Sequence, residues 1–201
     1  HRSPAACPAL AEARRAGSLP ESFPAILSAM TRDELIQRIA DVALLRGEFK
    51  LRSGRTSHYY LDKYLFSTQP DILAELGKLF AERVTDDVTV LAGAELGGIP
   101  LVTAASLAAG RPCVFIRNQK KDYGTAKQLE GKLGEGDVVM LVEDVCTTGG
   151  QVLEAAKVIE STGAKVAKIV GTIDREEGAR ENIEQAGHRF ETLFTRTDLG
   201  V

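Results

Sequence analysis

Several features that would point to common classes of protein are missing from this sequence of 201 residues. The three cysteines, Cys7, Cys113 and Cys146, are widely spaced and form neither a CxxC pair nor a metal-ligand cluster, which suggests a reducing compartment. No apolar run is long enough to span a membrane. The charges are mixed, with a net charge of -3 and no basic block, which disfavours nucleic-acid binding. We therefore expect one cytoplasmic domain with a full hydrophobic core, without a nucleic-acid or membrane partner.

The stretch 138–151, VVMLVEDVCTTGGQ, carries most of the recognisable chemistry. Its β-branched start, Val138 to Val142, predicts a buried parallel strand, and helical spacing follows Gly150. Glu143 and Asp144 lie between them, ahead of a turn of hydroxyls and glycines. The free N–H groups and dipole of a helix start favour a phosphate, whereas carboxylates can accept hydrogen bonds from vicinal hydroxyls or lie near Mg²⁺. The pattern predicts a ribose 5-phosphate site, and a strand ending in solvated acids is the alternative.

Strand and helix patterns alternate along the rest of the chain. Thr31 and Glu34 form a capping-box pattern ahead of a helix that we expect to end near Gly47. Further helices are expected at 71–84, from the turn at 93–100 to 109, and after Gly150 to about 163; strands are expected at 88–92, 112–117, 130–133, 138–142, 165–172 and 190–195. This alternation predicts an α/β fold with a mainly parallel central sheet flanked by helices.

Residues 1–29 differ from the rest of the chain. They are rich in Ala, Pro, Arg and Ser, have weak periodicity and lack the order of a secretory signal. We expect a disordered extension or sequence upstream of a natural start at Met30, and a transit-type leader is the alternative. Residues 30–201 are then a single domain.

The segment 49–66, FKLRSGRTSHYYLDKYLF, combines cations with aromatic residues. The cations are Lys50, Arg52, Arg55 and Lys63, and the aromatic residues include Tyr59, Tyr60 and Tyr64. One interpretation is a β-hairpin with a solvated basic face. The other is a lid over a planar, anionic ligand, with cations for its charge and aromatic rings for its plane.

Three polar turns follow predicted strands. The turn Glu95-Leu96-Gly97-Gly98 can hold a second anionic group, although it fits neither a Walker A loop nor GxGxxG. The segment 117–125, RNQKKDYGT, is charged and lacks apolar periodicity, so it is either an exposed mobile loop or one that closes over substrate. Arg175 can fork onto a carboxylate or pair with Glu176 or Glu177.

The stretch 138–151 resembles the phosphoribosyl-pyrophosphate (PRPP) signature of the type I phosphoribosyltransferases. The segments 49–66 and 117–125 are similar to the amino-terminal hood and catalytic loop of the orotate phosphoribosyltransferases. The resemblance covers nearly all of 31–201 and implies the type I fold, with a small hood, largely 30–66, and a mobile catalytic loop.

The resemblance also implies a role for individual residues. PRPP binding would fall to Arg117, Asn118, Lys121, Tyr123, Glu143, Asp144, Val145, Cys146, Thr147, Thr148, Gly149, Gly150 and Gln151. Orotate binding would fall to Arg52, Tyr60, Thr147 and Arg175, with Glu95, Leu96, Gly97 and Gly98 on the pyrophosphate side. Catalysis would rest on Lys121, Arg117 and Asp144. Asn118 stands where the family usually has Lys, which removes one charge near the pyrophosphate.

The implied reaction joins orotate to the ribose of PRPP and gives orotidine 5′-monophosphate and pyrophosphate. Mg²⁺ would be the cofactor, held mainly through PRPP with no certain protein ligand. A homodimer is implied, in which loop 117–125 completes the neighbouring site. The alternatives are a phosphoribosyltransferase for another base and a non-catalytic PRPP or nucleotide sensor on the same fold.

Overall fold

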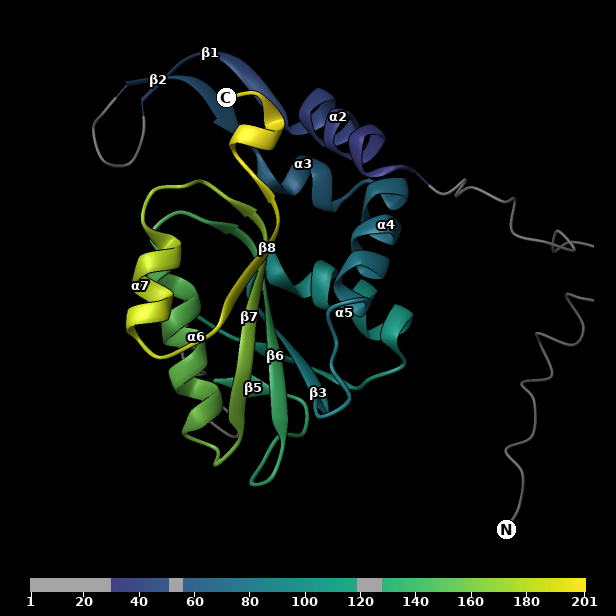
Figure 1. Ribbon diagram of the computed structural model, residues 1–201, viewed down its shortest axis with the longest axis vertical. Helices are drawn as coiled ribbons and strands as arrows, with labels where there is room; N and C mark the ends of the chain where they lie inside the picture. The colour runs from purple at the N-terminus through teal and green to yellow at the C-terminus, as the bar shows by residue number, and fades with distance from the viewer. Residues whose placement is uncertain (1–29, 51–55, 119–127) are drawn as a thin grey trace, which may run out of the picture.

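The computed structural model describes residues 30–50, 56–118 and 128–201, which form a six-stranded sheet with helices on both faces and a separate two-stranded hairpin (Figure 1). The strand order in the sheet is β5-β4-β3-β6-β7-β8. The strands are β3 (Val90–Ala94), β4 (Cys113–Ile116), β5 (Leu129–Glu130), β6 (Val138–Cys146), β7 (Lys165–Asp174) and β8 (Phe190–Thr195). Neighbouring strands are parallel, except that β4 and β5 are antiparallel. The expected mainly parallel α/β fold is confirmed.

Two helical layers bury the faces of this sheet. The main helices are α2 (Arg32–Ala43), α4 (Pro70–Ala81), α5 (Gly98–Ala109), α6 (Gly150–Glu160) and α7 (Ala179–Gln185). Met140 and Val142 of β6 belong to the core with α2, α4 and α5, whereas Val139 and Leu141 belong to the core with α6 and α7. Because both faces are covered, the strand is apolar throughout rather than alternating.

The amino-terminal part of the described chain forms the hood. After α2, strands β1 (Leu44–Lys50) and β2 (Thr56–Leu61) pair antiparallel, and the short helix α3 (Lys63–Ser67) follows. The capping box of α2 is confirmed, since the Thr31 hydroxyl accepts from the Glu34 backbone N–H at 3.3 Å and the Thr31 N–H donates to the Glu34 carboxylate at 2.8 Å. In Figure 1 the hairpin lies at the same end of the molecule as the short helix η1 (Thr197–Leu199).

Some expected boundaries were wrong. Helix α2 ends at Ala43 rather than near Gly47, because Leu44 already pairs with Leu61 in the hairpin. Strand β6 continues past Val142 to Cys146, because its last residues still pair with β7. Helix α7 was not anticipated.

In the part of the chain that the structure describes, no helix is long and apolar enough to cross a membrane. The expectations for residues 1–29, for Arg52 and for 119–127 lie outside the described residues.

Candidate functional site

The acid pair lies at the carboxyl end of β6, and both side chains are buried. Glu143 is 5% and Asp144 1% exposed. The Asp144 N–H donates to Glu143 Oε1 at 2.9 Å, and the Val145 N–H donates to Asp144 Oδ1 at 2.5 Å. Burial, followed by the charge of Asp144, raises the pKa of Glu143 to about 8. Because both side chains are buried, the alternative of strand-end acids in open solvent is wrong.

A cation from the hood faces this pair. Lys63 Nζ of α3 lies 2.8 Å from Asp144 Oδ2. Burial lowers the pKa of Lys63, but the hydrogen bond and the charge of Asp144 raise it by more, so the pKa is raised overall and the lysine stays charged. The sequence pattern placed Lys63 either on a solvated basic hairpin or in a lid over an anionic ligand. Its contact with β6 had no signal in the sequence, because it depends on how the hood packs on the sheet.

The turn after β6 leads directly into the start of α6. Gly149, at φ +78°, precedes the helix and has no side chain that could cap its free N–H groups. A Cβ at this position would also meet Ile183 of α7. The Asn182 side chain donates to the Thr148 carbonyl at 2.9 Å, so α7 supports the turn from behind. This arrangement leaves an uncapped helix start that suits a phosphate.

The Cys146 thiol is buried beneath this turn. Burial, followed by the charge of Glu143, raises the pKa of the thiol well above its usual value, so it is neutral. Its Sγ lies close to Gly171 of β7, where an added Cβ would collide with it. These facts favour a small buried residue over a reactive thiol.

The turn after β3 approaches the acid pair from the other side. Gly97 lies so close to Asp144 that a Cβ there would overlap Asp144 Oδ2. The preceding peptide bond, between Glu95 and Leu96, is cis, and the Leu96 side chain is exposed. Asp144 at the end of β6 is thus in contact with the hood lysine on one side and with the turn on the expected pyrophosphate side on the other.

Asn118 ties the start of the charged loop to two other elements. Its backbone N–H donates to Glu95 Oε1 at 2.6 Å, and its side-chain amide donates to the Glu95 carbonyl at 3.2 Å. Gln151 of α6 donates both to the Glu95 carbonyl at 3.0 Å and to Asn118 Oδ1 at 3.2 Å. A cavity of about 190 Å³ next to these residues is also lined by Arg117.

Arg175 follows β7 and lies under the hood. Its backbone N–H donates to the Cys146 carbonyl at 2.9 Å, which fixes it beside the end of β6. The guanidinium pairs with Glu177 at 3.0 Å and lies 5.9 Å from the ring centre of Tyr59. Its Nε has no hydrogen-bond partner within the described residues. Arg175 therefore has donor capacity left for a ligand.

The hood presents Tyr59, rather than Tyr60, to this arginine. Tyr60 is 44% exposed, and its ring packs on Phe49 with centroids 5.7 Å apart. Side chains alternate along β2, so the two tyrosines face opposite ways. The aromatic pattern indicated that a ring would reach the site, but only the register of the hairpin decides which one.

Three of the expected site residues lie outside the described residues: Arg52, Lys121 and Tyr123. Within 30–50, 56–118 and 128–201, no group of three or more His, Cys, Asp or Glu side chains is placed to hold a metal ion. Asp144 pairs with Lys63 at 2.8 Å, and carboxylate oxygens suit a cation carried by the ligand.

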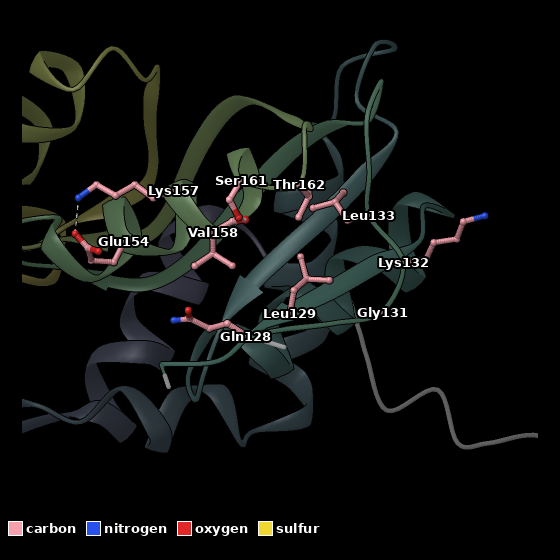
Figure 2. A pocket seen from close by; sticks show the side chains of 10 residues that line it. All are labelled: Gln128, Leu129, Gly131, Lys132, Leu133, Glu154, Lys157, Val158, Ser161 and Thr162. Atoms are coloured by element: carbon pink, nitrogen blue, oxygen red, sulfur yellow. Dashed lines mark hydrogen bonds and ion pairs between the residues drawn. The ribbon is translucent and has the colours of Figure 1, made fainter. Parts of the chain in front are cut away.

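A second hollow lies away from these residues. It has a volume of about 660 Å³ and lies between α6 and the segment around β5 (Figure 2). Figure 2 shows its rim, where Lys157 pairs with Glu154 at 2.6 Å. Neither the acid pair nor the glycine turn nor Arg175 lines this hollow, so it is not part of the candidate site.

Comparisons with known proteins identify the family of this chain. Residues 66–190 match the model of the phosphoribosyl transferase domain family. The chain is 46% identical over 172 residues to orotate phosphoribosyltransferase of Thermococcus gammatolerans, covering 84% of this chain and 91% of that protein. It is 42% identical over 171 residues to the protein of the same name from Natronomonas pharaonis, covering 85% and 98%.

The fold has solved relatives as well. The structure of Mycobacterium tuberculosis H37Rv orotate phosphoribosyltransferase in complex with PRPP superposes with a TM-score of 0.73 at 32% identity. The match covers 85% of this chain and 99% of that chain.

Proposed function

Because this chain belongs to the phosphoribosyl transferase family, and within it to the orotate phosphoribosyltransferases, we infer that it transfers the 5-phosphoribosyl group of PRPP to orotate. The products are orotidine 5′-monophosphate and pyrophosphate, in the synthesis of UMP and the other pyrimidine nucleotides. The enzyme is a glycosyltransferase of the pentosyltransferase class. The single observation that carries this function is the buried acid pair beside an uncapped helix start, with Arg175 at the end of the next strand.

The donor side of the site holds the parts that PRPP requires. Asp144, and Glu143 beside it, would accept hydrogen bonds from the ribose hydroxyls. The turn 145–150 and the start of α6, with Gln151, would hold the 5-phosphate through backbone N–H groups and hydroxyls. The turn 95–98 would face the pyrophosphate. Uncapped N–H groups and a buried carboxylate next to each other support this assignment.

Mg²⁺ would enter with the donor. Bound to PRPP, it would neutralise charge on the leaving pyrophosphate. The carboxylate of Asp144, together with the phosphate oxygens, is the ligand chemistry that Mg²⁺ prefers. The lysine paired with Asp144 favours contact through the donor over direct ligation by protein side chains alone.

The acceptor side would bind orotate under the hood. Arg175 and Thr147 each follow the paired ends of β7 and β6, Asp174 and Cys146. Arg175 would fork onto the orotate carboxylate, and Thr147 would donate to the ring. Arg52 and Tyr60 of the hood remain predicted contacts, and Tyr59 joins them because it lies against Arg175. A purine carries no such carboxylate, which argues against a purine acceptor.

Charge development explains what the catalytic residues must do. Breaking the bond from ribose C1 to the pyrophosphate oxygen leaves cationic character on the sugar and negative charge on the leaving group. Asp144 would stabilise the sugar side, while Lys121 and Arg117 would stabilise the pyrophosphate, with Asn118 and Tyr123 among the donor contacts. No covalent nucleophile is needed.

The test is the loss of orotate absorbance in the presence of PRPP and Mg²⁺. We expect loss that requires both additions. Lys121→Ala should lower kcat by on the order of 10² or more with an unchanged circular dichroism spectrum, because it removes a preorganised charge. Wild-type turnover by this variant would refute its role. Saturable PRPP binding without orotate turnover would favour another base or a sensor.

The assembly and setting of the enzyme complete the proposal. We propose a homodimer in which loop 117–125 of one protomer completes the site of the other. We also propose that residues 30–201 form the whole catalytic domain, without residues 1–29, and that the enzyme works in the cytoplasm. The two described cysteines, Cys113 and Cys146, are free thiols, which fits a reducing compartment.

A further inference from the structure

Lys63 makes a contact that its place in the sequence does not explain. It lies on α3 of the hood, yet its ammonium reaches the end of β6, 2.8 Å from Asp144 Oδ2. The carboxylate is 1% exposed and the lysine side chain 31%. A surface ion pair of this length would contribute little, but here one partner is fully buried, so removing the other would leave a buried carboxylate without its cation.

The same carboxylate oxygen also borders the turn on the pyrophosphate side. Oδ2 of Asp144 occupies the space that a side chain at Gly97 would need. The other oxygen, Oδ1, accepts from the Val145 N–H. Lys63 therefore fixes the one oxygen that the backbone of β6 leaves open, at the point where hood, strand and turn meet.

We propose that Lys63 is a positioning residue that holds the Asp144 carboxylate in place as the acceptor for the ribose hydroxyls of the donor. This inference rests on the proposed function, since it assigns the acid pair to PRPP. It adds a residue of the hood, whose other expected contacts are with orotate, to the donor side of the site. The hood thereby couples the two substrates, because its docking on the sheet also completes the PRPP site.

The experiment compares Lys63→Met, Lys63→Arg and the wild type. For Lys63→Met we expect a PRPP KM at least tenfold higher and a smaller change in the orotate KM. Lys63→Arg should recover most of the PRPP KM. Lys78→Met is the matched control, because Lys78 on α4 pairs with the buried Glu75 at 2.7 Å but is remote from the site.

A double variant separates positioning from simple tethering of the hood. If Lys63 acts through Asp144, Lys63→Met with Asp144→Asn should be no worse than Asp144→Asn alone. Additive losses, or a Lys63→Met enzyme with the wild-type PRPP KM, would overturn the proposal. If Lys63→Met does not fold, Lys63→Gln replaces it in the same comparison.

The outcome remains interpretable if the proposed function fails. Calorimetric titration with PRPP and Mg²⁺ needs no turnover. Suppose that the wild-type protein binds PRPP but does not consume orotate. Weaker PRPP binding by Lys63→Met than by the wild type would then support the role of Lys63, whereas the lack of turnover would refute orotate as the acceptor. Equal PRPP binding by both proteins would refute the role of Lys63.

Discussion

At the scale of single residues, chemistry in this site depends on groups that burial has altered. Burial raises the pKa of Glu143 to about 8, Asp144 is paired with Lys63, and Arg175 keeps donor capacity under the hood. None of these states follows from the residue types alone. Each depends on which neighbour shares the buried space.

Arg175→Lys tests the fork geometry of the orotate contact. Lysine keeps the charge but cannot make two parallel hydrogen bonds, so the KM for orotate should rise by about 10- to 100-fold with little change in the KM for PRPP. Steady-state kinetics with each substrate varied will measure this. Arg180→Lys, on the exposed face of α7, is the control and should behave as wild type. A parallel rise in both KM values would argue against a specific orotate contact.

Gly97→Ala tests the close approach of the turn to Asp144. The added Cβ would overlap the carboxylate oxygen, so either the turn or Asp144 must move, and kcat/KM for PRPP should fall by on the order of 10². Gly134→Ala is the matched control, because a Cβ there meets nothing within 4 Å. Equal activity of the two variants would mean that the turn does not need this contact.

Glu143 should make stability fall with rising pH. Its folded pKa of about 8 lies above the unfolded value of 4.5, so the folded state binds the proton more tightly. The stabilisation that this proton contributes is therefore lost as pH rises from 4.5 to 8. The free energy of unfolding falls over this range by at most about 1.4 kcal/mol per pH unit from this group.

Glu143→Gln removes this dependence, because the amide cannot ionise. The stability of the variant relative to wild type should increase steadily between pH 5 and 8, as measured by urea unfolding at several pH values. Stability curves that stay parallel over this range would show that Glu143 titrates near its unfolded value.

At the scale of elements, the strand, turn and helix around 138–160 act as one unit that other elements support. Helix α7 packs behind the glycine turn through Asn182 and Ile183. Helix α3 brings Lys63 to the end of β6. The turn 145–150 is thus held in shape by elements that are distant from it in the sequence.

Asn182→Ala should weaken donor binding without touching the donor. It removes the hydrogen bond to the Thr148 carbonyl, which costs roughly 1 kcal/mol, and we expect a PRPP KM about fivefold higher. The control is Glu181→Ala, an exposed neighbour on the same helix. Should both variants have the wild-type KM, α7 would have no part in shaping the turn.

At the scale of the whole molecule, the described residues form one sheet with a hood at the carboxyl ends of its central strands. That edge is where parallel α/β proteins bind ligands. The proposed dimer extends this arrangement, since a loop from a second protomer would close the same edge.

Mixing two inactive variants tests the shared site. In a mixture of Lys121→Ala and Arg175→Met, a mixed dimer would contain one site with both residues intact. Random exchange of subunits should then restore about a quarter of the wild-type activity, which can be measured after brief mild denaturation and refolding. The control mixes Lys121→Ala with Arg117→Ala, whose losses lie on the same loop, and should restore nothing. No recovery in the first mixture would place each loop in its own site.

The sequence by itself determined the local units of this protein. Period, turn residues and the helix start predict the glycine turn at 145–150, the capping box at Thr31 and the mainly parallel sheet, because these depend on neighbours within a few residues. Tertiary structure alone decided that Lys63 pairs with Asp144, that Tyr59 rather than Tyr60 faces Arg175, and that α7 supports the turn. These contacts join segments far apart in the chain, and their geometry is set by packing and strand register, which no local pattern encodes.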